Sequence, residues 1–202
     1  MTLWRGKSPL ILASQSRARQ VLLANAGISF KSIPADIDER AVQQNSGLSA
    51  PADVAAVLAR EKALWVSSHQ PGRFVIAADQ TLALGDRLFS KPAGRAQAAE
   101  QIRALAGRSH ELHSAVAVAC DGAILFETVT IARMTMRTLG EAELAAYLDE
   151  AGAAVTSSVG AYQLEGLGVH LFDRIEGDHF TILGLPLLPL LAFLRSEHLL
   201  AL

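Results

Sequence analysis

A serine and two arginines follow the first apolar run of the chain, where they could bind an anion. Leu10 to Ala13 predicts a buried strand, and Ser16 to Ala26 predicts a helix. The start of a helix carries unsatisfied N–H groups and partial positive charge, which favour a bound anion. Ser14, Arg17 and Arg19 would add a hydroxyl and guanidinium groups to that site. A serine cap followed by two solvated arginines accounts for the same residues.

An aspartate closes the next strongly apolar run. Phe74 to Ala78 predicts a central strand that ends at Asp79. Ligands of open α/β sheets commonly bind at strand ends, and a carboxylate there can hold a metal or accept a proton from water. Lys91 follows a short hairpin-like segment and directly precedes Pro92. An aspartate that caps a strand and a surface lysine are the structural alternative.

Three clustered carboxylates and one helical lysine are further candidates. Asp36, Asp38 and Glu39 follow a short predicted strand, and their oxygens could bind a hard divalent cation. Lys62 lies in a strong helical pattern from Pro51 to Ser67. A solvated acidic loop and an exposed helical lysine explain the same residues without a site.

Other chemistries have weaker support. His110 and His113 are three residues apart on a predicted strand, so their side chains should point to opposite faces and should not share a zinc ion. The chain lacks the glycine-rich dinucleotide fingerprint and the P-loop motif. A hydrolase triad built on Ser14 is discounted because the nucleophile-elbow motif is missing.

The predicted elements alternate between strand and helix, which indicates a layered α/β domain. An Asp-Gly turn at 121–122 predicts a hairpin and therefore a mixed sheet. No linker or repeat interrupts the pattern, so we expect one domain over residues 1–202. The remaining predicted elements are helices at 94–105 and 141–149 and after Pro186, and strands at 29–33, 112–120 and 124–138, with a last hairpin formed by 169–175 and 180–183.

Composition limits the partners of the protein. Half of the 202 residues are apolar, 19% are charged and the formal net charge is −2, so generic binding to a polynucleotide backbone is not expected. Cys120 is the only cysteine, which fits a reducing compartment. The most apolar stretch, Ile182 to Leu194, is too short to span a bilayer and contains two prolines. We therefore expect a cytoplasmic protein without a membrane anchor.

Taken together, these segments resemble the Maf family of nucleoside triphosphate pyrophosphatases. The markers stand in the family order: ASQSRARQVLLANAGISF, DIDE, LAREKA, AADQ, SKP, LAGRSHELHSAVAV, GAYQLEG and GLPL. The resemblance implies a layered α/β sandwich with a long twisted mixed sheet flanked by helices, with two lobes and a cleft between them. It also implies a cytosolic homodimer that uses a divalent cation, Mg²⁺ or Mn²⁺. The reaction would cleave the α–β phosphoanhydride bond.

The resemblance also implies roles for individual residues. Asp79 matches the proton acceptor of the family. Ser14 and Arg19 match its phosphate-side serine and arginine. The phosphate-binding lysines correspond to Lys62 and Lys91. Glu39 matches the acidic residue of the DIDE segment, which would hold the metal together with Asp79. Such a set fits phosphoryl transfer, which depends on positioning and charge neutralisation.

Three positions track base specificity in the family, and here they are Ala18, Gln80 and Glu165. Gln80 and Glu165 match the subgroup that acts on 7-methyl-GTP, and none of the three matches the subgroup that acts on dTTP and UTP. Ala18 departs from the 7-methyl-GTP pattern, since it lacks the aromatic ring expected there for stacking. Ser157 to Val159 also departs, because the family often has Asp-Lys-Ala at these positions.

The leading interpretation is therefore a metal-dependent enzyme that removes modified nucleotides, with 7-methyl-GTP as the expected substrate. Specificity for dTTP and UTP is one alternative. A nucleotide-binding regulator of septum formation without significant turnover is another. The joint presence of Asp79, Lys62, Lys91, Arg19 and Glu39 favours the enzyme, because a protein that only binds would not need the full set.

Overall fold

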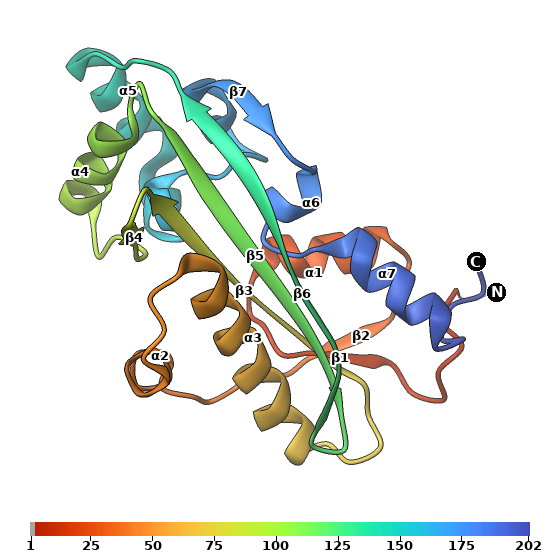
Figure 1. The fold of residues 1–202 in the computed structure, drawn as a ribbon. Helices are drawn as coiled ribbons and strands as arrows, with labels where there is room; N and C mark the ends of the chain where they lie inside the picture. Colours follow the sequence, from red (N-terminus) through yellow and green to blue (C-terminus); the bar gives the residue numbers. More distant parts are fainter. Residues whose placement is uncertain (1–2) are drawn as a thin grey trace. The chain divides into compact units, whose positions relative to one another are not determined.

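The structure, a computed structural model, describes residues 3–202 as a mixed α/β fold (Figure 1). The strands are β1 (Leu10–Leu12), β2 (Phe30–Ser32), β3 (Val75–Leu84), β4 (Arg87–Phe89), β5 (Ser109–Cys120), β6 (Ala123–Met136) and β7 (Phe172–Glu176). The α-helices are α1 (Arg17–Asn25), α2 (Glu39–Ser46), α3 (Pro51–Ser68), α4 (Arg95–Leu105), α5 (Glu141–Ala151), α6 (His179–Ile182) and α7 (Leu187–Ser196). Three short 3₁₀ helices, η1 (Gly152–Thr156), η2 (Val159–Ala161) and η3 (Leu167–Leu171), connect α5 to β7.

The seven strands form one sheet in the order β2-β1-β3-β5-β6-β7, with β4 paired to β3. β1 runs parallel to β2 and β3, whereas β4 and β7 run antiparallel to their neighbours. Asp121 and Gly122 connect β5 to β6 with φ of 49° and 75°, the positive values that a tight hairpin turn requires. The predicted α/β class and mixed sheet are confirmed.

The chain divides into two compact units. The first contains residues 1–80, 114–130 and 179–202, of which the structure describes those from residue 3, and the second contains residues 81–113 and 131–178. The long strands β3, β5 and β6 contribute residues to both units. The single domain over residues 1–202 and the cleft between two lobes stay predictions.

In the first unit, alternating side chains of β1 and β3 build two separate cores. Leu10, Leu12, Ile76 and Ala78 pack with buried residues of α1 and α7. Ile11, Ala13, Val75 and Ala77 pack instead with the small, buried face of α3, which consists of Ala55, Ala59, Ala63 and Val66. Because successive side chains of a strand point to opposite faces, α3 covers one face of the sheet and α1 and α7 cover the other (Figure 1).

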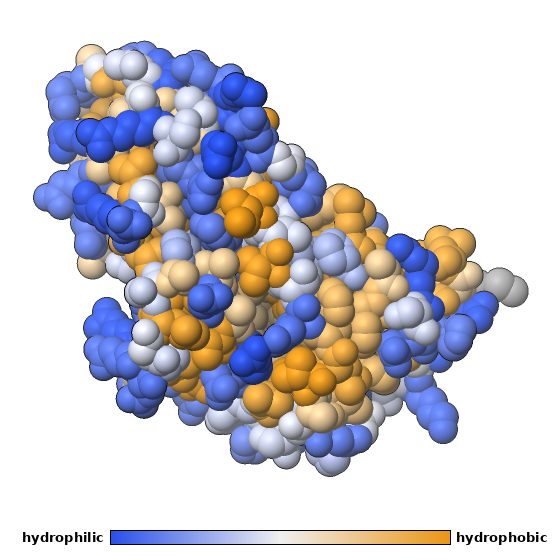
Figure 2. Space-filling model, viewed as in Figure 1, coloured by the Kyte–Doolittle hydropathy of each residue, from blue (hydrophilic) through white to orange (hydrophobic). Residues whose placement is uncertain are grey.

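The predicted apolar helix near the C-terminus is α7, whose buried positions are Leu187, Leu190 and Leu194. Its opposite side is less covered: Leu188 is 55% exposed, and Figure 2 shows apolar surface over this helix. Within residues 3–202, no helix combines the length and the apolar character needed to cross a membrane.

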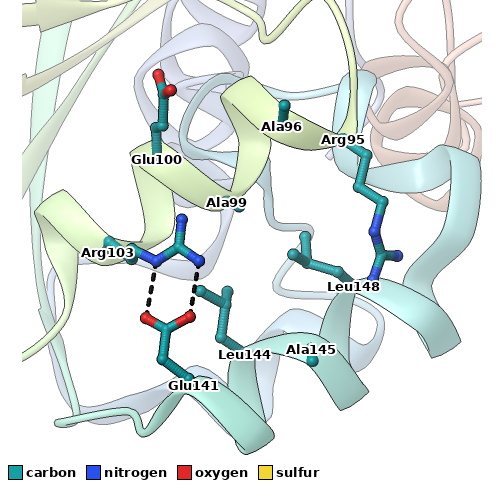
Figure 3. Close-up of a pocket in the computed structure, with 9 residues that line it drawn as sticks. All are labelled: Arg95, Ala96, Ala99, Glu100, Arg103, Glu141, Leu144, Ala145 and Leu148. Atoms are coloured by element: carbon teal, nitrogen blue, oxygen red, sulfur yellow. Dashed lines mark hydrogen bonds and ion pairs between the residues drawn. The ribbon is translucent and has the colours of Figure 1, made fainter.

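In the second unit, α4 and α5 enclose a groove of about 590 Å³ (Figure 3). Ala96, Ala99, Leu144, Ala145 and Leu148 supply its apolar lining. Arg103 spans the groove and forms two hydrogen bonds to the Glu141 carboxylate, at 2.8 and 2.7 Å. The groove contains none of the predicted site residues.

One predicted boundary and one predicted hairpin are wrong. The strand predicted to end at Asp79 continues to Leu84, because Thr81 to Leu84 are again mostly apolar and buried. The predicted last hairpin does not form. Its first arm is η3 followed by β7, which pairs with β6, and its second arm is the short helix α6.

Candidate active site

Asp79 lies within β3, on the face of the sheet that α3 covers. It follows Val75 and Ala77 in the strand alternation and is only 9% exposed. Lys62, on α3, is one residue before the buried Ala63 and reaches this face. Its Nζ donates a hydrogen bond of 2.6 Å to Oδ1 of Asp79. The strand can therefore continue through an aspartate because the buried carboxylate has a cationic partner.

Glu39 adds a second carboxylate to the same ammonium group. Its Oε1 lies 2.7 Å from Nζ of Lys62. Glu39 is the first residue of α2, and the preceding Asp38 caps that helix by accepting a hydrogen bond of 3.0 Å from the backbone N–H of Ala41. Of the three clustered carboxylates predicted to form a site, Glu39 alone contacts Lys62, whereas Asp38 is a helix cap and Asp36 is exposed.

Burial raises the pKa of Asp79, because the charged carboxylate loses its hydration. The positive charges of Lys62 and Arg19 act in the opposite direction and lower that pKa, without cancelling the effect of burial. Burial also lowers the pKa of Arg19, whose charge Asp79 and Glu39 stabilise in turn. A carboxylate with a raised pKa is a better proton acceptor than an ordinary surface aspartate.

Arg19, in the first turn of α1, has a side chain that is hydrogen-bonded to other elements of the fold. Ser16 caps α1, accepting a hydrogen bond from the backbone N–H of Arg19. The Arg19 side chain donates from Nη1 to the carbonyl of Ala78 at 2.6 Å and to Oγ of Ser14 at 3.3 Å. Arg17, in contrast, is exposed. The expected anion site thus contains Ser14 and Arg19 beside the strand that carries Asp79.

Gln80 points to the opposite face of β3 from Asp79, toward the elements that hold Arg19. Its Nε2 shares its hydrogens among Oγ of Ser114 at 2.8 Å and the carbonyls of Thr181 and Ile182 at 3.0 and 3.1 Å. Ser114 and Thr181 are fully buried. The amide nitrogen is therefore engaged within the protein, and Oε1 is the atom of Gln80 that could meet a ligand. Ala18, in the first turn of α1, is half-buried.

The other two predicted site residues belong to the second unit. Lys91 is exposed and follows β4, and Glu165 is exposed in the segment between η2 and η3. The first unit therefore brings together Ser14, Arg19, Glu39, Lys62, Asp79 and Gln80.

Gln101 links the segment that carries Lys91 to η2, the 3₁₀ helix that precedes Glu165, and sequence reasoning did not identify it. This buried residue of α4 donates from Nε2 to the carbonyl of Ser90 at 2.8 Å. Its Oε1 accepts a hydrogen bond of 3.1 Å from the backbone N–H of Gly160. The sequence did contain a signal for this role. Gln101 stands on the apolar face of the helix predicted at 94–105, and a buried amide needs hydrogen-bond partners.

The two histidines that could suggest zinc have other surroundings. His110 Nε2 lies 2.7 Å from the hydroxyl of Tyr162, and both side chains are buried. His113 Nε2 lies 3.3 Å from the carboxylate of Glu111. Among the described residues, no group of three or more His, Cys, Asp and Glu side chains could hold a metal ion by itself.

Comparisons with known proteins show which family the chain resembles. The model of the Maf-like protein family matches residues 9–197. Nucleoside triphosphate pyrophosphatases from Bradyrhizobium diazoefficiens and Rhodopseudomonas palustris are 73% and 70% identical to this chain over 201 residues, covering 100% of both sequences in each case. A 7-methyl-GTP pyrophosphatase from Brucella abortus is 52% identical over 93% of this chain and 96% of its own length. The solved structure of a HAM1 protein from Coxiella burnetii is a weaker match, with a TM-score of 0.44 and 19% identity over 63% of this chain and 72% of that one.

The family match covers almost the whole chain, and the expected markers carry the residues that the fold gathers around β3. The relatives match from end to end at high identity. The chain therefore belongs to the Maf family.

Proposed function

We propose that this chain hydrolyses nucleoside triphosphates to a nucleoside monophosphate and pyrophosphate. The observation that carries the proposal is the buried Asp79 carboxylate, bound by Lys62 at 2.6 Å, on the strand that also anchors Arg19. The full-length relatives bear the name nucleoside triphosphate pyrophosphatase, and the chain is an enzyme of that class.

Asp79 would act as the proton acceptor for the attacking water. Lys62 holds Oδ1, which fixes the carboxylate and leaves Oδ2 for a water molecule. As the water oxygen forms its bond to phosphorus, its proton passes to Asp79. The anhydride P–O bond then breaks, and its electron pair stays with the leaving phosphate oxygen. The raised pKa of Asp79 favours this proton transfer.

Arg19, Ser14 and Lys62 would bind the phosphate groups. Phosphoryl transfer needs several donors to neutralise charge on the phosphate oxygens, and a guanidinium already held in place loses little entropy on binding. Lys91, in the second unit, is proposed to contribute one more cation.

Glu39 and Asp79 would hold a divalent cation, Mg²⁺ or Mn²⁺. Their donor set fits, because both carboxylates already converge on one positive charge, Nζ of Lys62, at 2.7 and 2.6 Å. Mg²⁺ is commonly bound by one or two carboxylates together with water and substrate phosphates, so two protein carboxylates suffice. When bound, such a cation would neutralise the phosphates and polarise the phosphoryl oxygens.

For the nucleobase we propose 7-methylguanine. Glu165 is exposed and could accept hydrogen bonds from N1–H and the exocyclic amine of guanine, and its charge would attract a methylated, cationic base. Gln80 would contribute its Oε1. The Brucella relative bears the name 7-methyl-GTP pyrophosphatase, which supports this choice over dTTP and UTP.

The test is pyrophosphate release from 7-methyl-GTP, GTP, UTP, dTTP, CTP and ATP, with Mg²⁺ and with Mn²⁺. We expect selective turnover of 7-methyl-GTP. Asp79→Asn should lower kcat by roughly 10²- to 10⁴-fold, the usual contribution of a general base, while nucleotide binding persists. Preference for UTP or dTTP would overturn the base assignment and keep the reaction. Absence of turnover with every nucleotide and both metals, in a folded protein, would favour a regulator that only binds.

A further inference from the structure

The Gly-Leu-Pro-Leu marker at residues 184–187 has no part in the proposed chemistry, yet its glycine contacts Arg19. The carbonyl of Gly184 accepts a hydrogen bond of 2.7 Å from Nε of Arg19. The two residues are 165 positions apart in the sequence, and α1 and the turn after α6 bring them together. Both residues lie in the first unit.

This hydrogen bond determines which N–H donors of the Arg19 guanidinium remain available to a ligand. A guanidinium has five N–H donors, one on Nε and two on each Nη. Gly184 takes the Nε donor, and Ala78 and Ser14 take the two donors of Nη1. Within residues 3–202, Nη2 has no hydrogen-bond acceptor, so its two donors can meet a phosphate.

A side chain at position 184 would also crowd the Arg19 guanidinium. Its φ is +84°, a conformation that disfavours any residue with a Cβ atom. A Cβ added there would lie 3.3 Å from Nη2 and 3.4 Å from Nε of Arg19. It would also lie 3.6 Å from Oε1 of Gln80. The first atom that it meets is the nitrogen whose donors are free.

The short helical turn α6, which ends just before Gly184, is itself held in place by buried hydrogen bonds. Gln80 Nε2 donates to the carbonyls of Thr181 and Ile182, and Oγ of Ser114 donates to the Thr181 carbonyl at 2.7 Å. Oγ1 of Thr130 lies 2.7 Å from Oγ1 of Thr181. Because β3, β5 and β6 all bind this turn, it cannot shift easily to accommodate a displaced arginine.

We propose that Gly184 is a positioning residue for Arg19. Its carbonyl and its bare α-carbon hold the guanidinium with Nη2 directed to the substrate phosphates. The inference rests on the proposed phosphate-binding role of Arg19. It gives a physical reason for a glycine at the start of the GLPL marker.

The first test compares Gly184→Ala with Gly72→Ala. Gly72 has a similar φ of +67°, but a Cβ there meets nothing within 4 Å, so it controls for backbone strain. We expect Gly184→Ala to lower kcat/KM by roughly 10- to 100-fold, mainly through kcat, because a small displacement of a positioned group costs up to about 10²-fold. Gly72→Ala should keep the wild-type kcat and KM. Equal kinetics in the two variants would overturn the proposal.

A second comparison separates positioning from a general structural effect. Arg19→Lys keeps the charge but removes the guanidinium, so Gly184→Ala should have little further effect in that background. If it reduced kcat/KM by the same factor there as in the wild type, Gly184 would not act through Arg19.

Thr130→Val provides an independent variant if Gly184→Ala folds poorly, because it removes a hydrogen bond between β6 and Thr181 of α6 without removing a partner of Arg19 or Gln80. It should lower kcat in the same direction and by a smaller factor, and an unchanged kcat would contradict the inference. Wild-type turnover in Arg19→Lys and Arg19→Ala would instead refute the proposed role of Arg19, and the positioning role would fall with it. Loss of turnover in these arginine variants but not in Gly184→Ala would refute the positioning role alone.

Discussion

Replacing Lys62 with methionine should expose how much the site depends on one ammonium group. Lys62 pairs with Asp79, whose side chain is 13% exposed, and with Glu39, whose side chain is 55% exposed. Removing the partner of a buried charge costs about 3–5 kcal/mol, whereas an exposed pair contributes about 0–1 kcal/mol. We therefore expect Lys62→Met to lower the free energy of unfolding at pH 8 by about 3–5 kcal/mol, nearly all of it through Asp79.

The pH dependence has a definite sign. Burial raises the pKa of Asp79 in the folded protein, and Lys62→Met removes a charge that lowers it, so the pKa rises further. The folded state then binds a proton more readily than the unfolded state, and stability falls as the pH rises through the folded pKa. The loss caused by Lys62→Met should therefore be larger at pH 8 than at pH 5.

Urea denaturation between pH 5 and pH 8 measures this effect, and two variants serve as controls. Lys62→Met/Asp79→Asn should recover most of the lost stability, because the uncompensated charge is gone. Arg60→Met, also on α3, breaks an exposed pair with Glu127 and should cost about 1 kcal/mol or less. Equal stability of Lys62→Met and the double variant at every pH would refute the reasoning.

Two further predictions concern the second unit. Gly160→Ala should lower the free energy of unfolding, measured by urea denaturation, by about 1–3 kcal/mol more than Gly85→Ala does. Both glycines have a positive φ, but a Cβ at Gly160 would lie 2.6 Å from Cδ1 of Leu82, whereas a Cβ at Gly85 meets nothing within 4 Å. Equal losses in the two variants would contradict the steric argument. Burial lowers the pKa of His110 to about 4. The free energy of unfolding should therefore fall as the pH is lowered from about 6.5 to about 4, because the unfolded chain takes up a proton there that the folded protein does not. His110→Gln should flatten this part of the stability curve, and an unchanged slope would exclude His110 as its source.

The elements of the first unit could largely be predicted because their sequence patterns are local. The strand at Leu10, the helix that Ser16 caps and the helix that begins at Pro51 all match the structure closely. The sequence did not predict where β3 ends, because an aspartate after an apolar run is typical of the end of a strand unless a cationic partner for it is known. That partner, Lys62, comes from a different element, and no local pattern indicates the pairing.

The same limit applies to Arg19 and to the C-terminal segment. The sequence allowed either a solvated or a bound arginine, and burial against Gly184 and Ala78 distinguishes the two. Phe180 to Leu183 has strand-like composition but forms one short helical turn. Buried polar groups from β3, β5 and β6 bind that turn, and tertiary contacts of this kind override weak local preference.

The alternation of β3 also bears on the need for a metal. Asp79 faces Lys62 and Glu39 across one face of the sheet, while Arg19 is anchored on the other side by the carbonyl of Ala78. The two cations and two carboxylates of this group cancel formally, which lets them coexist in a partly buried site. A triphosphate brings several further negative charges, and these four residues have no surplus positive charge to neutralise them. Charge balance therefore calls for additional cations at the moment of binding, which is the reason that we propose a divalent metal at Glu39 and Asp79 and a contribution from Lys91.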